Sequence, residues 1–216
     1  MINLFVLVRT MQANRRSMHS FSLVLLLSLA AFALGDPPSA SFLEESERGW
    51  LRAHPLIRVA PDPDFPPIES FDSNGKFVGI AADVLSHVEQ RLGIKFQVVR
   101  CQNWDEVLAK ARAKQVDMLS AAAVTPQRSE YLLFTSPHIS LPGVIISRKE
   151  INQNLTLDKL HGMRLSVVSG YVWQEYLSRD YPDIRLDPVG DVKTGLRKVS
   201  FGLSDAMVEN IATSIQ

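Results

Sequence analysis

The segment RLSVVSGYVWQEYLSRDYPDIRLDPVGDVKTGLRKVSFGLSDAMV, residues 164–208, alternates between two kinds of pattern. Short β-branched and apolar runs, typical of strands, are separated by longer runs whose apolar residues recur every three or four positions, as in helices. Strands that alternate with helices predict a mostly parallel sheet covered by helices. The predicted strands are residues 164–168, 184–189 and 206–208, and the predicted helices are residues 171–181 and 192–201, the second closed by Gly202.

The same alternation occurs earlier in the chain. Residues 80–92 and 104–113 have helical periodicity, and Gly93 ends the first of these helices. The predicted strands between them are residues 57–60, 95–99 and 116–124, and the apolar face of the first helix is Ile80, Val84, Leu85, Val88 and Leu92. Residues 136–149 join the two sets and contain two prolines followed by a β-branched run. This segment predicts an extended crossing, so the fold class is α/β in two lobes.

The N-terminus has the three parts of a secretory signal peptide. Residues 1–35 contain three arginines and no acidic residue, then an apolar run at 21–34, then small residues up to Gly35. A membrane anchor is the alternative, but a span needs about 20 apolar residues and this run is shorter. We expect cleavage after Gly35, with Ala40 as second choice, and a periplasmic product. Met11 and Met18 are alternative starts.

Composition excludes several classes of function. The 216 residues include 23 basic and 23 acidic side chains, without the basic runs that bind nucleic acid. The histidines are scattered and lack metal-ligand spacing. Cys101 is the only cysteine, so no internal disulfide forms, and we expect a small buried apolar residue there. A capping box at Ser41 and Glu44 predicts a leader helix within residues 36–55.

Eight short motifs in this order resemble the bacterial family 3 extracellular solute-binding proteins. They are Arg58-Val59-Ala60-Pro61-Asp62, Phe65-Pro66-Pro67, Gly75 to Asp83, Val116-Asp117-Met118-Leu119, Thr125-Pro126-Gln127-Arg128, Phe134-Thr135-Ser136-Pro137, Leu157 to Gly162, and Val167-Val168-Ser169-Gly170. The preceding Trp50-Leu51-Arg52-Ala53-His54-Pro55 resembles the sensor modules of hybrid histidine kinases.

The resemblance implies a two-lobed periplasmic-binding-protein fold of type II, the Venus-flytrap fold. The expected parts are lobe 1 at 56–138, a hinge crossing at 139–149 and lobe 2 at 150–216. In this family the chain returns to the first lobe and ends in helices there. Because the sequence stops at Gln216, that C-terminal return segment is expected to be missing.

Arg128 and the segment from Ser169 to Tyr171 are the main candidates for ligand contact. Arg128 follows a buried strand, and the family's matching arginine grips a ligand carboxylate with its guanidinium fork; the alternative is an exposed arginine in a turn. Ser169 and Gly170 precede a predicted helix, whose free N–H groups favour anions. Ordinary helix capping is the alternative there. Tyr171 is expected to narrow the edge of the cleft.

Further candidates follow from the resemblance, some of them as departures from it. Phe65 and Trp104 match aromatic positions around the family's ligand, although Trp104 at a helix start also fits a core residue, and Asp62 matches a polar position. Two positions differ from amino-acid binders. In the run from Ala121 to Ala123, Ala123 replaces a hydroxyl residue, and Asn210 replaces a ligand-binding aspartate. These changes favour a carboxylate or another polar metabolite over an α-amino acid.

Three functions remain open at this point. The first is a receptor for a small molecule that serves an ABC-transporter membrane complex, and the second is the sensor module of a linked transmembrane kinase or cyclase. The third is the regulatory domain of a lytic transglycosylase. Catalysis of that kind needs a placed acid in a further domain, so we expect a binding protein and no enzyme. No cofactor is expected.

Overall fold

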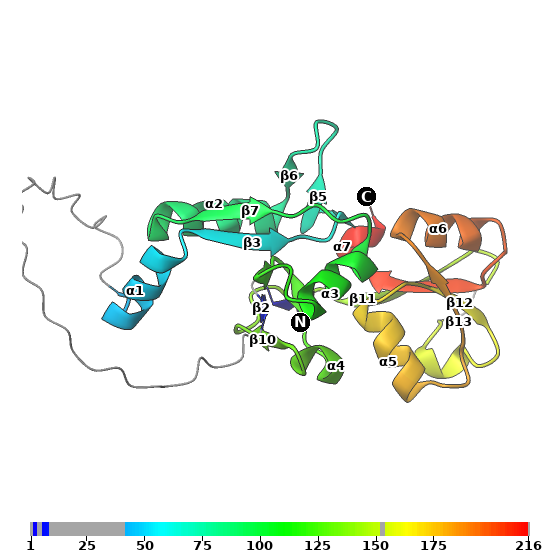
Figure 1. Cartoon of the computed structure of the whole chain (residues 1–216). Coiled ribbons are helices and arrows are strands. Elements are labelled where there is room, and N and C mark those ends of the chain that lie inside the picture. Colours follow the sequence, from blue (N-terminus) through cyan, green and yellow to red (C-terminus); the bar gives the residue numbers. More distant parts are fainter. Residues whose placement is uncertain (1, 4–5, 9–41, 152–153, 216) are drawn as a thin grey trace, which may run out of the picture.

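The computed structural model describes residues 2–3, 6–8, 42–151 and 154–215. Two lobes lie side by side in Figure 1, with lobe 1 (cyan to green) on the left and lobe 2 (yellow to red) on the right. Each lobe is built on its own sheet with helices packed against it. Much of the predicted signal peptide lies outside the described residues, and no described helix is long and apolar enough to cross a bilayer.

Lobe 1 contains a five-stranded sheet of order β10-β2-β8-β3-β7. Strand β3 runs parallel to β7 and β8, whereas β2 runs antiparallel to β8 and β10. The strands are β2 (Val6–Val8), β3 (Leu56–Ala60), β7 (Lys95–Val98), β8 (Met118–Leu119) and β10 (Leu132–Phe134). The helices α2 (Ile80–Leu92) and α3 (Trp104–Arg112) belong to this lobe.

Smaller elements complete lobe 1. A three-stranded sheet of β4 (Asp64–Phe65), β5 (Glu69–Phe71) and β6 (Phe77–Val78) projects beside α2. Strand β1 (Ile2–Asn3) pairs antiparallel with β9 (Ala122–Ala123). The short helix α4 (Pro126–Ser129) follows β9, and helix α1 (Glu45–Ala53) precedes β3.

Lobe 2 contains a four-stranded sheet of order β11-β14-β12-β13. Strand β12 (Arg164–Val168) is parallel to β13 (Arg185–Val189) and β14 (Ala206–Asn210), while β11 (Gly143–Ser147) is antiparallel to β14. The helices are α5 (Val172–Asp180) and α6 (Val192–Ser200), with the short η1 (Leu157–Lys159) and α7 (Ile211–Ser214). The predicted alternation of strands and helices in this half is confirmed.

Several expected boundaries differ from the structure. The leader helix is capped at Glu44, whose backbone N–H donates to the Glu47 carboxylate at 2.8 Å, while Ser41, the expected cap, lies outside the described residues. The single strand expected at 116–124 is two short strands, and the β-branched run after Pro142 is β11, so it belongs to the second sheet. Ile80 is 42% exposed because Ala81 takes the buried place at that end of α2.

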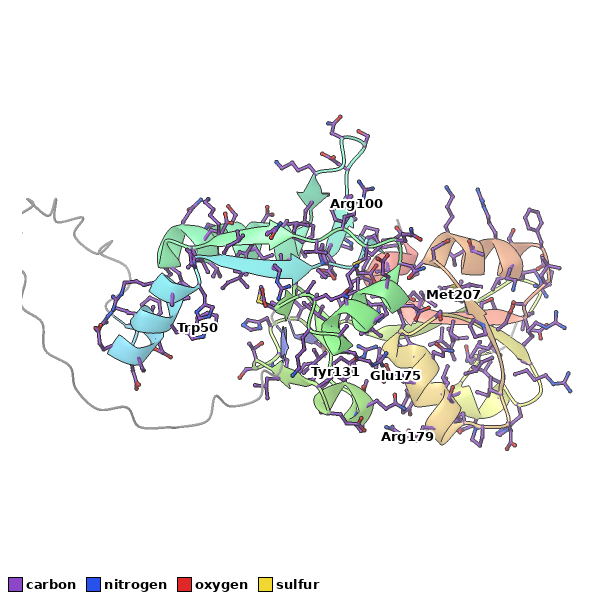
Figure 2. All side chains as sticks on the ribbon, viewed as in Figure 1. Trp50, Arg100, Tyr131, Glu175, Arg179 and Met207 are labelled. Atoms are coloured by element: carbon purple, nitrogen blue, oxygen red, sulfur yellow. The ribbon has the colours of Figure 1, made fainter. Side chains whose placement is uncertain are left out.

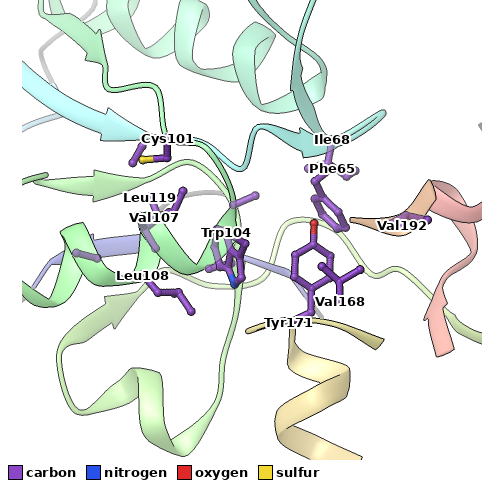
Figure 3. Packing of buried hydrophobic residues seen from close by; sticks show 14 of the residues in the cluster. Phe65, Ile68, Cys101, Trp104, Val107, Leu108, Leu119, Val168, Tyr171 and Val192 are labelled. Carbon is purple, nitrogen blue, oxygen red and sulfur yellow. The ribbon is translucent and has the colours of Figure 1, made fainter. Parts of the chain in front are cut away.

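The largest cluster of buried side chains spans both lobes. Phe65, Trp104 and Leu119 from lobe 1 pack in one cluster with Val168 and Tyr171 from lobe 2, as Figure 3 shows. Cys101 belongs to this cluster at 4% exposure, which confirms the expected buried position. Separate clusters lie within lobe 1, around Ile57 and Leu85, and within lobe 2, around Leu165 and Leu177. The lobes are therefore closed on each other, and the place where they meet holds most of the predicted site residues.

Candidate functional site

A small cavity of about 40 Å³ lies where the two lobes meet. Its lining comes from lobe 1 through β4, α3 and the segment around β9, and from lobe 2 through the start of α5 and the end of β14. The lining residues are Asp62, Phe65, Glu69, Trp104, Ala121, Ala122, Ala123, Arg128, Tyr171, Val172 and Asn210. Eight of the ten predicted site residues are among them. Ser169 and Gly170 do not line the cavity.

Three aromatic rings meet at the cavity. Tyr171, the residue before α5, is only 7% exposed, and its ring lies perpendicular to the rings of Phe65 and Trp104, with ring centroids 5.7 and 6.2 Å away. Figure 3 shows the tyrosine hydroxyl directed up into lobe 1. Perpendicular contacts of this kind are favourable for aromatic rings. The two rings that were expected to flank a ligand therefore flank Tyr171.

Buried acids stand behind this aromatic group. The Asp62 carboxylate accepts hydrogen bonds from the Tyr171 hydroxyl at 2.6 Å and from the Asp64 backbone N–H at 2.9 Å. Glu69 accepts from the Asp62 backbone N–H at 2.9 Å and from the Ser120 hydroxyl. Burial disfavours the charged form of a carboxyl group. It raises the pKa of Asp62 to about 6 and the pKa of Glu69 well above its usual value.

A further buried acid, Glu209, lies beside the cavity residue Asn210. Its carboxylate accepts from the Asn210 side-chain amide at 2.9 Å and from the Thr213 hydroxyl at 3.1 Å, while its Oε2 atom has no hydrogen-bond partner within the described chain. Burial raises the pKa of Glu209 to about 7. Asn210 is therefore held in place by its neighbour. The acid at this end of β14 is Glu209, not an aspartate at position 210.

Arg128 is a buried cation that lines the cavity. It lies in α4, where its backbone N–H is accepted by Thr125, and its side chain is 2% exposed. Its Nε and Nη2 atoms lie 3.0 and 2.9 Å from one carboxylate oxygen of Glu175. Nη1 donates to the carbonyl of Ala123 at 3.1 Å, and Nη2 donates to that of Gly170 at 2.8 Å. The alternative of an exposed turn arginine is wrong, and burial lowers the pKa of Arg128.

The amides before α5 are already engaged within lobe 2. The N–H groups of Ser169 and Tyr171 donate to the carbonyls of Val189 and Val168, and that of Gly170 donates to the Gln174 side chain at 2.7 Å. The expectation of free anion-binding amides differs from the structure, because strand pairing and capping use these donors. Gly170 instead presents its carbonyl to lobe 1.

Gly170 lies tightly against lobe 1. Its φ of +69° is in the left-handed region that favours glycine. A Cβ atom there would lie 2.5 Å from Asp105 Oδ1 and 3.2 Å from Trp104 Cδ1. The Trp104 indole N–H also donates to the Gly170 carbonyl at 2.9 Å. This residue therefore permits the close approach of the two lobes.

Sequence reasoning missed four participants: Glu69, Val172, Glu175 and Glu209. Glu175 carried a usable signal, because it follows Tyr171 by four positions and so lies on the same face of α5. Glu209 lies in a strand whose residues are all buried, but the predicted strand ended at 208. Glu69 lies in the three-residue strand β5, which is too short to show a periodic pattern in the sequence. Together these acids give the site an excess of carboxyl groups over its single buried arginine.

The comparisons with known proteins agree with this architecture. Residues 57–214 match the bacterial extracellular solute-binding proteins, family 3. The chain is 28% identical over 182 residues to the virulence sensor protein BvgS of Bordetella pertussis, covering 82% of this chain and about 15% of that protein. It is 24% identical over 164 residues to ABC transporter arginine-binding protein 1 of Escherichia coli, covering 76% of this chain and 60% of that protein.

Solved structures show the same fold. The periplasmic VFT2 domain of Bordetella pertussis BvgS is 27% identical and superimposes with a TM-score of 0.68, covering 78% of this chain and 72% of that domain. The two sheets, the crossing between them and the site at their junction are the features of a two-lobed Venus-flytrap fold. The chain belongs to the bacterial extracellular solute-binding proteins, family 3.

Proposed function

We propose that this chain captures a small organic ligand in the cleft between its lobes and that the capture serves signalling. The observation that carries the proposal is the convergence on one cavity of Arg128 from lobe 1 and of Tyr171 and Asn210 from lobe 2. A ligand that contacts both lobes changes their separation only through contacts that differ between open and closed states. Residues from both sides of one cleft provide such a difference.

The ligand class is an amino acid or a carboxylate-bearing metabolite. Arg128 is the group suited to a carboxylate, since its planar fork matches two oxygens. An arginine-binding protein among the relatives supports an amino acid. Two residues argue against an α-amino acid. Asn210 brings no charge for an ammonium group, and Ala123 brings no hydroxyl for the carboxylate. A raised pKa also leaves much of Glu209 neutral near pH 7. We therefore favour a carboxylate over an α-amino acid.

Signalling is preferred to transport because of the extent of the match. The likeness to BvgS runs over 182 residues, beyond the 57–214 matched by the family, whereas the arginine-binding relatives match at lower identity. The partner of a sensor module is a covalently linked transmembrane kinase. The transport alternative, supported by those relatives, has an ABC-transporter membrane complex as its partner. A binding role fits both.

Calorimetric titration of the full chain tests ligand capture. We expect heat of binding from at least one compound in a set of L-arginine, L-glutamate, succinate and citrate. Arg128→Lys keeps the charge and loses the fork, so affinity should fall by about tenfold or more, since charge-assisted hydrogen bonds contribute about 1.5–3 kcal/mol. Arg112→Lys, an exposed position in the same lobe, is the matched control. Equal affinities for the parent and Arg128→Lys would contradict the assigned role of Arg128.

We further propose that the chain is exported and processed near Gly35. Members of this family are extracellular or periplasmic proteins, and the N-terminal 35 residues carry the charge and apolar pattern of a cleavable leader. N-terminal sequencing of the protein from a periplasmic extract should begin at Asp36, or at Ser41 if Ala40 is the site. Recovery of an intact Met1 from the cytoplasmic fraction would overturn this assignment.

A further inference from the structure

The cleft is already filled by side chains from lobe 2. Tyr171 lies between Phe65 and Trp104 and its hydroxyl donates a hydrogen bond to Asp62, so it makes the aromatic and polar contacts that a bound molecule would make. The remaining cavity of about 40 Å³ is far below the roughly 300 Å³ or more of common ligand pockets. A small metabolite therefore cannot enter unless Tyr171 moves.

The carboxylate partner of Arg128 also comes from lobe 2. Glu175 places one oxygen against two guanidinium nitrogens, and the Gly170 carbonyl takes a third contact. The Glu175 side chain is 18% exposed and Arg128 is 2% exposed, so the pair is largely shielded from water. Figure 2 labels Glu175 where α5 faces lobe 1. A ligand carboxylate would have to replace this internal carboxylate.

Tyr171 and Glu175 act together because of their spacing. Residues four apart lie on the same face of a helix, and these two flank the first turn of α5. Both therefore move as one body with lobe 2, and opening the cleft withdraws the ring from Asp62 and the carboxylate from Arg128 in the same motion.

We infer that Tyr171 and Glu175 form an internal ligand that closes the lobes when no small molecule is bound, and that they select what the cleft accepts. This inference rests on the proposed function of the cleft. An incoming molecule must bring a carboxylate that replaces Glu175 at Arg128 and a hydrogen-bond donor that replaces Tyr171 at Asp62. Closed molecules cannot bind, so the apparent affinity for a ligand falls in proportion to the open fraction. The pair therefore favours ligands that make both contacts.

Distance measurement between the lobes tests the inference on the ligand-free full chain. Spin labels are placed at exposed positions on α2 and α5, Ser86→Cys and Ser178→Cys, in a Cys101→Ala background. The unmodified cleft should give one short distance without ligand. The double variant Tyr171→Phe, Glu175→Gln should shift the population towards a longer distance by on the order of a hundredfold, because an unpaired buried guanidinium favours hydration.

Two controls on the same helix carry the same chemical changes. Tyr176→Phe and Asp180→Asn should leave the distance unchanged, since Asp180 pairs with exposed Arg179 and Tyr176 packs on Trp173 and Tyr181 within lobe 2. Circular dichroism checks that each variant is folded. If a variant does not fold, the parent distance still decides, because a long distance in the ligand-free parent overturns the inference. A double variant as closed as the parent overturns it as well.

Ligand titration separates this inference from the proposed function. L-arginine and succinate are titrated into the parent and into the opened double variant. The internal ligand predicts that affinity for at least one of them rises about tenfold or more in the variant. If the parent is closed and the variant open but neither form binds any compound of the wider set, the inference stands and the proposed function fails. If the parent is open and binds, the inference fails and the proposed function stands.

Discussion

Arg128→Ala is expected to lower the free energy of unfolding by about 3–5 kcal/mol, the range found when one partner of a buried ion pair is removed. The substitution leaves the Glu175 carboxylate without its counter-ion. The other Glu175 oxygen is buried and has no hydrogen-bond partner among the described residues, so the site offers the charge no replacement. It also removes the donors to the carbonyls of Gly170 and Ala123 and the cation over the Trp104 ring. Urea unfolding followed by circular dichroism measures the loss.

Arg112→Ala is the matched control for this prediction. Arg112 is an exposed arginine of lobe 1 that lies over the Tyr131 ring, so its removal should change stability by less than about 1 kcal/mol. Adding Glu175→Gln to Arg128→Ala should recover part of the loss, because the uncompensated charge is then gone. Identical urea midpoints for Arg128→Ala and the parent would mean that the buried pair contributes nothing to the fold.

Stability should fall as the pH rises from about 4 to about 7. Asp62 and Glu209 have folded-state pKa values of about 6 and about 7, above their usual values of 3.8 and 4.5. The folded chain therefore holds these protons more tightly than the unfolded chain. The contribution is complete below pH 4 and is lost as the pH passes the folded-state values. Each shift corresponds to about 3 kcal/mol, since one pKa unit is about 1.4 kcal/mol.

Other acids do not reverse this slope. Asp117, paired with Arg58, and Asp187, held by Lys198, have lowered pKa values, so their contributions are already complete above about pH 4. Urea midpoints at pH 4.5, 5.5, 6.5 and 7.5 measure the effect. Asp62→Asn keeps an acceptor for Tyr171 and should flatten the profile. A parent chain that is more stable at pH 7.5 than at pH 4.5 would contradict the prediction.

The sequence predicted the regular part of the fold because its helices and strands have clear periods. Strand β12 and helix α2 have their predicted limits, and Gly93 ends α2 with a φ of 67°. The strands β4, β5 and β6 were not predicted, since two or three residues are too few to show a period. Strand β11 was read as a linker because its partner β14 lies more than fifty positions later in the chain.

The site was predictable where one residue has a distinctive chemistry. Arg128, Asp62 and the aromatic positions were located from motifs, and they do meet at one cavity. Their partners were not predictable, because the pairing of Arg128 with Glu175 depends on how lobe 2 is rotated against lobe 1. No local pattern in the sequence encodes that rotation. The engagement of the Ser169 amide by Val189 likewise depends on the parallel pairing of β12 with β13.

Strand β2 lies within the leader that we propose is removed near Gly35, so its loss has a consequence for assembly. It pairs Val6 with Leu119 and Val8 with Leu132, so the first sheet is completed by residues more than a hundred positions away in the chain. Such long-range pairing is slow to form during folding. A chain that has lost residues 6–8 presents the facing edges of β8 and β10, separated by two interstrand spacings, about 10 Å. Two open edges at that spacing accept one strand from another molecule, which would pair with β8 on one side and β10 on the other.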